Sequence, residues 1–293
     1  MTQNRHDPAS WRSLLFVPAH VERFVARAHE RGADAVILDL EDAVPPGQKE
    51  AARAGLATAL ASVGQGGAAA MVRVNHGLRA LARDLEAAVL PGLAGLILPK
   101  VEEPGFVREV AAALDELEAE RGLPPGGIVL LLQVETPAAM PHLHAIAAAH
   151  PRVAAMTLGP EDFAAALGGV AEPETLLAPN FAVLCAARAA GIVPLGFVDS
   201  IGAFTDLEAF GKTVRAARRL GFLGALAIHP AQVAVLNREF SPGPQEIDWA
   251  RRVLAGEAEA RRAGRGAFQI GGRMVDPPVI RRAETILRRA WAP

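Results

Sequence analysis

Short apolar runs alternate along this chain with longer segments in which apolar residues recur every three or four positions. Runs such as IVLLLQV are apolar almost throughout, which is typical of parallel strands buried on both faces. The longer segments have helical spacing, clearest at Val107, Val110, Ala111 and Leu114. The predicted strands span residues 13–18, 35–40, 70–75, 95–99, 128–134, 154–158, 193–198 and 226–229.

Helix-length segments follow each of these strands. They span residues 21–31, 48–61, 81–89, 106–121, 137–149, 163–190, 206–220 and 231–240. Regular alternation of strands and helices indicates βαβ units. Eight such repeats favour a closed (β/α)₈ TIM barrel over residues 1–240, with an open doubly wound sheet as the alternative.

The alternation stops at the segment Ser241-Pro242-Gly243-Pro244. A helical pattern resumes over residues 245–262, a Gly-rich stretch follows, and a last helix is predicted after Asp276-Pro277-Pro278. A tail of this length is too short to bury a core of its own. We therefore expect residues 241–293 to form a C-terminal helical extension that packs on a neighbouring subunit or on the barrel.

Composition narrows the range of functions. Hydrophobic residues make up 51% of the 293 residues and the net charge is −2, so a packed core is expected and a basic nucleic-acid surface is not. The single cysteine, Cys185, excludes a disulfide within the chain. No apolar stretch approaches the roughly 18 residues of a membrane span. These features predict a cytoplasmic protein that binds neither nucleic acid nor membrane.

Polar residues gather where the apolar runs end. Because parallel strand ends meet on one rim of a barrel, which is the face that holds active sites, these side chains should lie together. The residues concerned are Asp39, Glu41, Asp42, Arg73, Lys100, Glu135, Gly159, Pro160, Glu161, Asp162, Asp199 and His229.

Several converging carboxylates are costly unless a partner neutralises them. Mg²⁺ is the natural partner, since it prefers one or two carboxylates together with water and substrate oxygens. Glu135 and Asp162 are the predicted ligands, and Asp39, Glu41 and Asp42 would orient them or hold waters. The alternative for Asp42 and Asp162 is helix capping.

An anionic substrate fits the same rim. The turn Gly159-Pro160-Glu161 leads from a strand into a helix, where backbone N–H groups can receive a carboxylate. Arg73 would direct its guanidinium toward a carboxylate or a developing enolate. The alternative for Arg73 is a structural salt bridge with Asp39 or Glu41.

At this point the motifs resemble those of the citrate lyase beta-subunit group, which includes malyl-CoA, citramalyl-CoA and citryl-CoA lyases. The matching segments run in family order over nearly the whole chain. They are RSLLFVPA, ADAVILDLEDAV, VRVN, GLILPKVE, QVETPAAM, LGPEDFAAALG, IHPAQV and GRMVDPPVIRRA.

The resemblance implies a Mg²⁺-dependent carbon–carbon lyase that acts on a 3-hydroxyacyl-CoA thioester and yields an acyl-CoA and an oxo-acid. It implies that Glu135 and Asp162 bind Mg²⁺ and that Arg73 contacts the oxo-acid and the enolate. It further implies that Asp276 is the acid/base group and reaches the site of a neighbouring subunit in a homotrimer or a dimer of trimers. From the residues alone, Asp276 is a helix cap before Pro277.

The chain departs from the family pattern at Leu223 and Ala225, where relatives often have an acid and a lysine, and at Val21, where many have a basic residue. These positions lie near the expected thioester or CoA tail. Two other functions therefore stay open: a CoA-independent aldolase on hydroxy-oxo-acids, and a catalytically silent lyase-like binding subunit.

Overall fold

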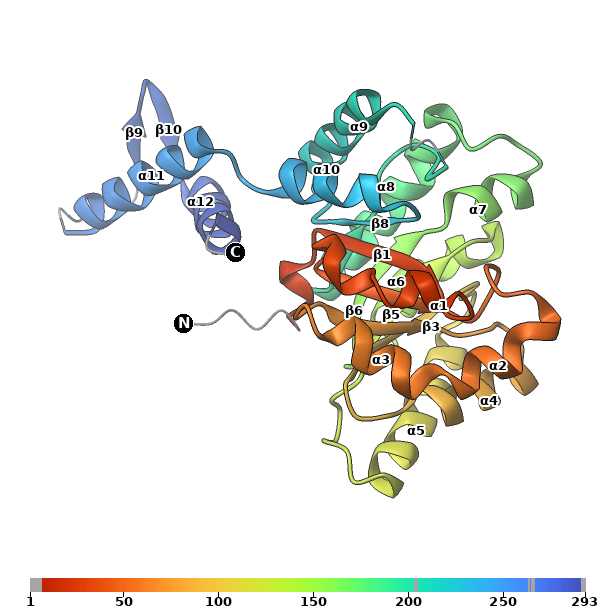
Figure 1. Cartoon of the computed structure of the whole chain (residues 1–293). Coiled ribbons are helices and arrows are strands. Elements are labelled where there is room, and N and C mark those ends of the chain that lie inside the picture. Colours follow the sequence, from red (N-terminus) through yellow and green to blue (C-terminus); the bar gives the residue numbers. More distant parts are fainter. Residues whose placement is uncertain (1–6, 203–204, 263, 265–266, 291–293) are drawn as a thin grey trace. The chain divides into compact units, whose positions relative to one another are not determined.

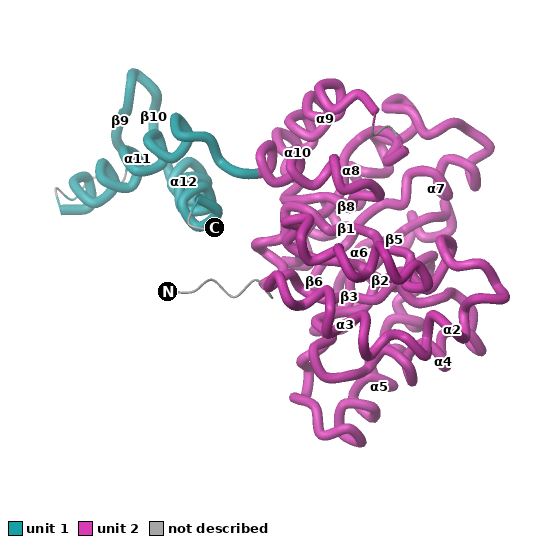
Figure 2. Tube along the Cα trace, in the orientation of Figure 1, with its two compact units in different colours: residues 1–4, 241–293 teal, residues 5–240 magenta. Residues whose placement is uncertain are grey.

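The structure is a computed structural model that describes residues 7–202, 205–262, 264 and 267–290. The chain divides into two compact units, coloured separately in Figure 2. Residues 5–240 belong to the larger unit, and residues 241–293 belong to the smaller one. Each unit is described by itself below.

The larger unit is a parallel barrel of eight strands surrounded by helices (Figure 1). Neighbours along the chain pair with one another, and β8 pairs with β1, where Leu226 lies opposite Leu14. An isolated bridge links Leu195 of β7 to Gly224, the residue before β8, where the two ends of the sheet meet. This confirms the (β/α)₈ prediction, and the open-sheet alternative is wrong. The strands are β1 (Ser13–Pro18), β2 (Ala35–Asp39), β3 (Ala69–Arg73), β4 (Leu93–Leu98), β5 (Val129–Val134), β6 (Val153–Leu158), β7 (Val193–Leu195) and β8 (Ala225–Ala227).

Helices follow the strands as predicted, but several differ in extent. The segment 48–61 is divided into two helices, and the segment 137–149 into a 3₁₀ turn and a short α-helix. The segment 163–190 is two helices rather than one, because Gly168 adopts a left-handed φ of 74° and ends the first. The segment 21–31 holds only one helical turn and a 3₁₀ turn. The α-helices are α1 (Glu22–Val25), α2 (Lys49–Ala54), α3 (Leu56–Gly64), α4 (Leu78–Ala88), α5 (Pro104–Glu120), α6 (Leu143–Ala147), α7 (Pro160–Leu167), α8 (Pro173–Ala190), α9 (Leu207–Leu220) and α10 (Pro230–Phe240). The 3₁₀ turns are Pro8–Ser10, Ala28–Arg31, Pro46–Gln48 and Pro137–His142.

Alternate residues of each strand face opposite layers of the core. Leu14, Ile37 and Met71 belong to a buried cluster contributed by the strands, which fills the barrel interior. Their neighbours, such as Val36 and Leu38, pack in the larger cluster that also contains the helices. Complete burial of each such side chain contributes about 1.5–3 kcal/mol, so the inner and outer layers both fix the strand register.

The smaller unit contains α11 (Pro244–Arg262), β9 (Phe268–Ile270), β10 (Arg273–Val275) and α12 (Pro277–Ala290). The strands β9 and β10 form a hairpin that the periodicity does not predict. Its two-residue turn is Gly271-Gly272, with φ of 57° and 76°, and this pair is itself a hairpin signal.

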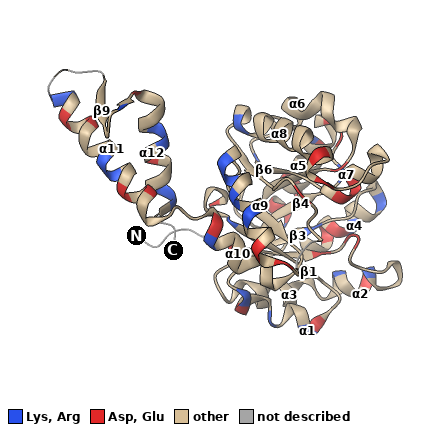
Figure 3. Ribbon diagram, turned by 90° about the horizontal axis from the view of Figure 1, so that it is seen from above, with Lys and Arg blue, Asp and Glu red and all other residues tan. Residues whose placement is uncertain are grey.

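The length of the tail predicts no core, whereas the smaller unit has a small buried cluster of its own. Ala250, Val253, Val275, Ala283 and Ile286 form this cluster. Acidic and basic residues both occur along α11 (Figure 3). This mixture is typical of a solvated helix face.

Within the described part of the chain, every helix is too short or too polar to cross a membrane.

Candidate active site at the carboxyl end of the barrel

A cavity of about 240 Å³ lies at the carboxyl ends of the strands. Strand alternation directs the polar residues into it: Asp39 shares a face with the interior residue Ile37, and Arg73 shares a face with Met71. The same rule carries Glu135, one residue past β5, onto the inner face with Leu131. The polar wall of this cavity is therefore set by strand register.

Asp39 and Arg73 form a bidentate pair at the cavity wall. Arg73 Nε donates to Asp39 Oδ1 at 2.7 Å, and Arg73 Nη2 donates to Asp39 Oδ2 at 2.6 Å. Burial alone would lower the pKa of Arg73, but the hydrogen bonds to Asp39 and its charge raise it. The guanidinium also lies 4.6 Å from the centroid of the Phe16 ring, in cation–π contact. These contacts hold the cation in one orientation.

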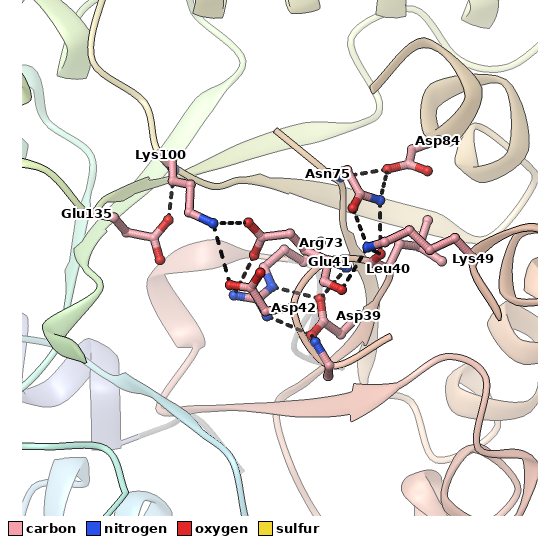
Figure 4. Close-up of polar contacts among 11 residues, drawn as sticks. Asp39, Leu40, Glu41, Asp42, Lys49, Arg73, Asn75, Asp84, Lys100 and Glu135 are labelled. Carbon is pink, nitrogen blue, oxygen red and sulfur yellow. Dashed lines mark hydrogen bonds and ion pairs between the residues drawn. The ribbon is translucent and has the colours of Figure 1, made fainter. Parts of the chain in front are cut away.

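Glu41 lies between two cations and is almost fully buried. Its Oε2 is 3.1 Å from Arg73 Nη1, as an ion pair, and its Oε1 accepts from Lys100 Nζ at 2.6 Å. Burial raises the pKa of Glu41, while Arg73 and Lys100 oppose that shift. Figure 4 shows Glu41 between Lys100 and Arg73.

Glu135 is 1% exposed and has one carboxylate oxygen without a partner. Its Oε2 accepts from the backbone N–H of Lys100 at 2.8 Å, whereas Oε1 has no hydrogen bond among the described residues. Burial, together with the charges of Glu41 and Asp162, raises the pKa of Glu135 to about 8. In the absence of a cation the site therefore resists ionisation of this carboxyl.

Hydrogen bonds from Lys49 and Asn75 fix the segment that carries Glu41 (Figure 4). Lys49 Nζ donates to the carbonyls of Leu40 and Glu41 and to the side chain of Asn75. Asn75 in turn donates to the fully buried Asp84 through its backbone and its side chain. The end of β2 is held in place from behind the cavity.

The turn before α7 brings Asp162 to the same cavity, together with Gly159, Pro160 and Glu161. The Gly159 N–H donates to Val134 O and Pro160 has no N–H, so neither can bind a substrate carboxylate through its backbone. The N–H groups of Glu161 and Asp162 precede the first intrahelical hydrogen bond and remain for that role. The Glu161 carboxylate accepts from Ser200.

Asp42 is not part of the cavity lining, and Asp276 is part of the smaller unit, which is described by itself. The Asp42 side chain is 58% exposed, does not line the cavity, and lies 3.5 Å from Lys100 Nζ. Asp276 belongs to the smaller unit, where its carboxylate is 3.4 Å from Val279 N at the start of α12. That contact has the geometry of a weak helix cap.

Two polar residues that line the cavity are absent from the sequence-based candidates. Gln133 is 6% exposed, and its Oε1 lacks a hydrogen bond within the described chain. Thr157 is 2% exposed on the neighbouring strand. The two-residue periodicity of a strand could have indicated Gln133, because it precedes Glu135 by two positions and therefore lies on the same face.

The described residues contain no group of three or more His, Cys, Asp or Glu arranged around a metal position. Mg²⁺ does not need one, since it commonly takes one or two carboxylates and keeps its waters. The unpartnered Oε1 of Glu135 and the nearby Asp162 provide that smaller donor set. The donor chemistry fits a hard divalent cation.

Known proteins match this chain over most of its length. Residues 12–230 match the model of the HpcH/HpaI aldolase/citrate lyase family. The chain is 33% identical to the citrate lyase subunit beta of Leuconostoc mesenteroides subsp. cremoris, covering 96% of this chain and 93% of that protein. It is 36% identical to a (3S)-malyl-CoA thioesterase of Cereibacter sphaeroides, covering 98% of this chain and 97% of that protein.

A solved structure is similar as well. The Mycobacterium tuberculosis protein CitE, in complex with magnesium, acetoacetate and coenzyme A, superposes with a TM-score of 0.71 and 35% identity, covering 97% of this chain and 99% of that one. The family match, the identities and the shared barrel agree with one another. This chain belongs to the HpcH/HpaI aldolase/citrate lyase family.

Proposed function

We propose that this chain is a Mg²⁺-dependent carbon–carbon lyase that cleaves or forms a 3-hydroxyacyl-CoA thioester, such as malyl-, citramalyl- or citryl-CoA. The products of cleavage would be an acyl-CoA and an oxo-acid. The observation that carries the proposal is the buried Glu135 carboxylate, which has an unpartnered oxygen in a cavity shared with Asp162 and Arg73. The magnesium, acetoacetate and coenzyme A bound to the M. tuberculosis relative support the same chemistry.

Glu135 and Asp162 would hold the metal ion. An unpaired buried carboxylate is costly, and the raised pKa of Glu135, about 8, reports that cost. When bound, Mg²⁺ makes a coordinated hydroxyl easier to deprotonate and neutralises charge on an oxo-acid. Asp39 and Glu41 would act indirectly, because both contact Arg73.

The remaining groups would bind and stabilise the anions. The N–H groups of Glu161 and Asp162 at the start of α7 would receive the oxo-acid carboxylate. In cleavage the hydroxyl would pass its proton to the acid/base group, the carbon–carbon bond would break, and its electron pair would pass to the thioester as an enolate. Arg73, fixed by Asp39, would stabilise that negative charge at the cavity wall.

Asp276 would supply the proton that the enolate carbon takes up, from the extension of a neighbouring subunit. The support is the family resemblance of the segment GRMVDPPVIRRA, and the homotrimer rests on the same resemblance. Mixing two inactive variants tests both ideas. Arg73→Ala and Asp276→Ala chains should regain activity when co-assembled, because some sites then combine an intact Arg73 with an intact Asp276.

The direct test is cleavage of malyl-CoA and citramalyl-CoA by Glu135→Gln, with free CoA, acyl-CoA and oxo-acid all quantified. Loss of one metal-binding carboxylate should reduce cleavage by at least about 100-fold. The matched control is Glu120→Gln, at an exposed position at the end of α5. Turnover of Glu135→Gln at the wild-type rate would refute the proposal.

Thioester hydrolysis is the second candidate, because one similar relative is a (3S)-malyl-CoA thioesterase. The same assay separates the functions by product. A lyase releases an oxo-acid with an acyl-CoA, and a thioesterase releases a hydroxy-acid with free CoA. A CoA-independent aldolase would cleave the free hydroxy-oxo-acid, and a silent subunit would bind Mg²⁺ and oxo-acid without turnover.

A further inference from the structure

Lys100 has an unusual backbone conformation immediately after β4. Its φ is 53°, and it is the one residue other than glycine with a positive φ in the described part of the chain. This left-handed conformation is unfavourable for a side chain with a Cβ atom, and such residues persist where the surrounding structure requires them. The outlier therefore calls for a function at this position.

The conformation directs the Lys100 backbone toward the cavity wall. Its N–H donates to Glu135 Oε2 at 2.8 Å, while the next residue, Val101, donates to Gln133 O on β5. The chain thus keeps its pairing with β5 and also supplies a hydrogen bond to the carboxylate. This bond holds one Glu135 oxygen, and Oε1 is left without a hydrogen bond among the described residues, on a side chain that lines the cavity.

The side chain of Lys100 turns to a different partner. Its Nζ is 2.6 Å from Glu41 Oε1, and the other Glu41 oxygen is 3.1 Å from Arg73 Nη1 (Figure 4). Burial would lower the pKa of Lys100, but the hydrogen bond to Glu41 and the charges of Glu41, Asp42 and Glu135 raise it to about 12. Neither Lys100 nor Glu41 lines the cavity, so both act from behind its wall.

We propose that Lys100 is a positioning residue that serves two parts of the site at once. Its backbone N–H orients Glu135. Its ammonium pairs with one oxygen of the Glu41 carboxylate, so that Arg73 stays directed at the cavity. Without the ammonium, Glu41 would attract Arg73 with its whole charge and would leave the cavity more negative. This inference rests on the proposed function, since it assigns Lys100 a role in binding Mg²⁺ and an oxo-acid.

The backbone and side-chain contacts of Lys100 predict different effects of its side chain on Mg²⁺ affinity and on pyruvate affinity. Lys100→Met keeps the backbone N–H but removes the ammonium. Its Mg²⁺ affinity should therefore not fall, because Glu135 stays oriented and the cavity becomes more negative, while the affinity of the Mg²⁺-loaded protein for pyruvate should fall by about tenfold or more. Isothermal titration calorimetry with Mg²⁺ alone, then with pyruvate at saturating Mg²⁺, measures both.

A second substitution isolates the mechanism. In the double variant Glu41→Gln/Lys100→Met the unneutralised charge is gone, so pyruvate affinity should return to within about threefold of wild type. Lys100→Arg should also retain it. The matched control is Lys212→Met, which breaks an exposed pair with Glu208 on α9 and should change neither affinity.

The outcomes distinguish the two proposals. Equal losses of Mg²⁺ and pyruvate affinity in Lys100→Met, no loss at all, or no recovery in the double variant would overturn the role of Lys100 while leaving the lyase proposal intact. A wild-type protein that binds neither Mg²⁺ nor pyruvate would overturn both. Thermal unfolding of each variant identifies any loss that comes from misfolding.

Discussion

Gly159 offers the sharpest steric test of the metal site. It has φ of −89° and ψ of 102°, a conformation that alanine adopts without strain. A Cβ atom added there would lie 2.6 Å from Glu135 Cγ, 2.7 Å from Glu135 Oε1 and 3.0 Å from Gln133 Nε2. Gly159→Ala therefore acts on the Glu135 carboxylate and not on the backbone.

The size of the effect follows from these distances. Ordinary contacts begin near 3.4 Å, so the Glu135 side chain must move by about 0.8 Å. Its Oε2 is tied to the Lys100 N–H, which limits how far it can rotate. Misplacement of a reacting group by about 1 Å can cost on the order of 100-fold in rate. We expect Mg²⁺ affinity and cleavage rate to fall together by roughly 10- to 100-fold.

Calorimetric Mg²⁺ titration and malyl-CoA cleavage measure this effect, and Gly47→Ala is the matched control. A Cβ atom at Gly47 meets nothing within 4 Å, so that variant should behave as wild type. Overpacking at Gly159 should cost about 1–3 kcal/mol of unfolding free energy, which urea denaturation measures. A folded Gly159→Ala protein with wild-type Mg²⁺ affinity would show that Glu135 is not a ligand.

Three further predictions concern stability. Because the pKa of Glu135 is raised to about 8 from an ordinary 4.5, the folded metal-free protein binds more protons than the unfolded chain between these values, and its stability falls as pH rises through them. In EDTA, the Tm of Glu135→Gln should therefore lie several degrees above that of wild type at pH above 8, and the two Tm values should be equal below pH 4.5. A Tm difference that does not change with pH would contradict this prediction. Arg152→Met should lower the free energy of unfolding, measured by urea denaturation, by about 3–5 kcal/mol, because the 1% exposed Glu118 loses its ion-pair partner at 2.5 Å. A loss under about 1 kcal/mol would contradict a stabilising role of this buried pair. Gly224→Ala should lower Tm sharply or prevent folding, because its Cβ would lie 2.2 Å from Trp11 O at the closure of the barrel, and a wild-type Tm would refute that packing.

Most of the fold could be predicted from the sequence, because parallel strands that are buried on both faces must be apolar along their length. The structure places each predicted strand within a few residues of its expected ends. The largest strand difference is β7, which ends at Leu195 because Gly196 has a φ of 140° that a regular strand does not contain. Such ends depend on neighbouring strands, and local composition does not specify them.

Part of the candidate site could also be predicted from the local pattern of the strands. Strand-end positions and period two bring Asp39, Arg73 and Glu135 to one cavity. Lys100 was visible as a strand-end residue, but nothing local indicated its left-handed φ or that its backbone would meet a carboxylate 35 positions away. Asp42 has the same strand-end signal as Asp39 and yet points outward.

By itself, the sequence determined which residues form strands, which of their faces point inward, and which acids lie near the rim, because these follow from local periodicity. Only the tertiary structure decided which acid meets which base. Contacts such as Glu41 with Lys100, or Asp39 with Arg73, join segments 34 to 59 positions apart. Their geometry depends on the ring closure between β8 and β1, and that closure is a property of all eight strands together.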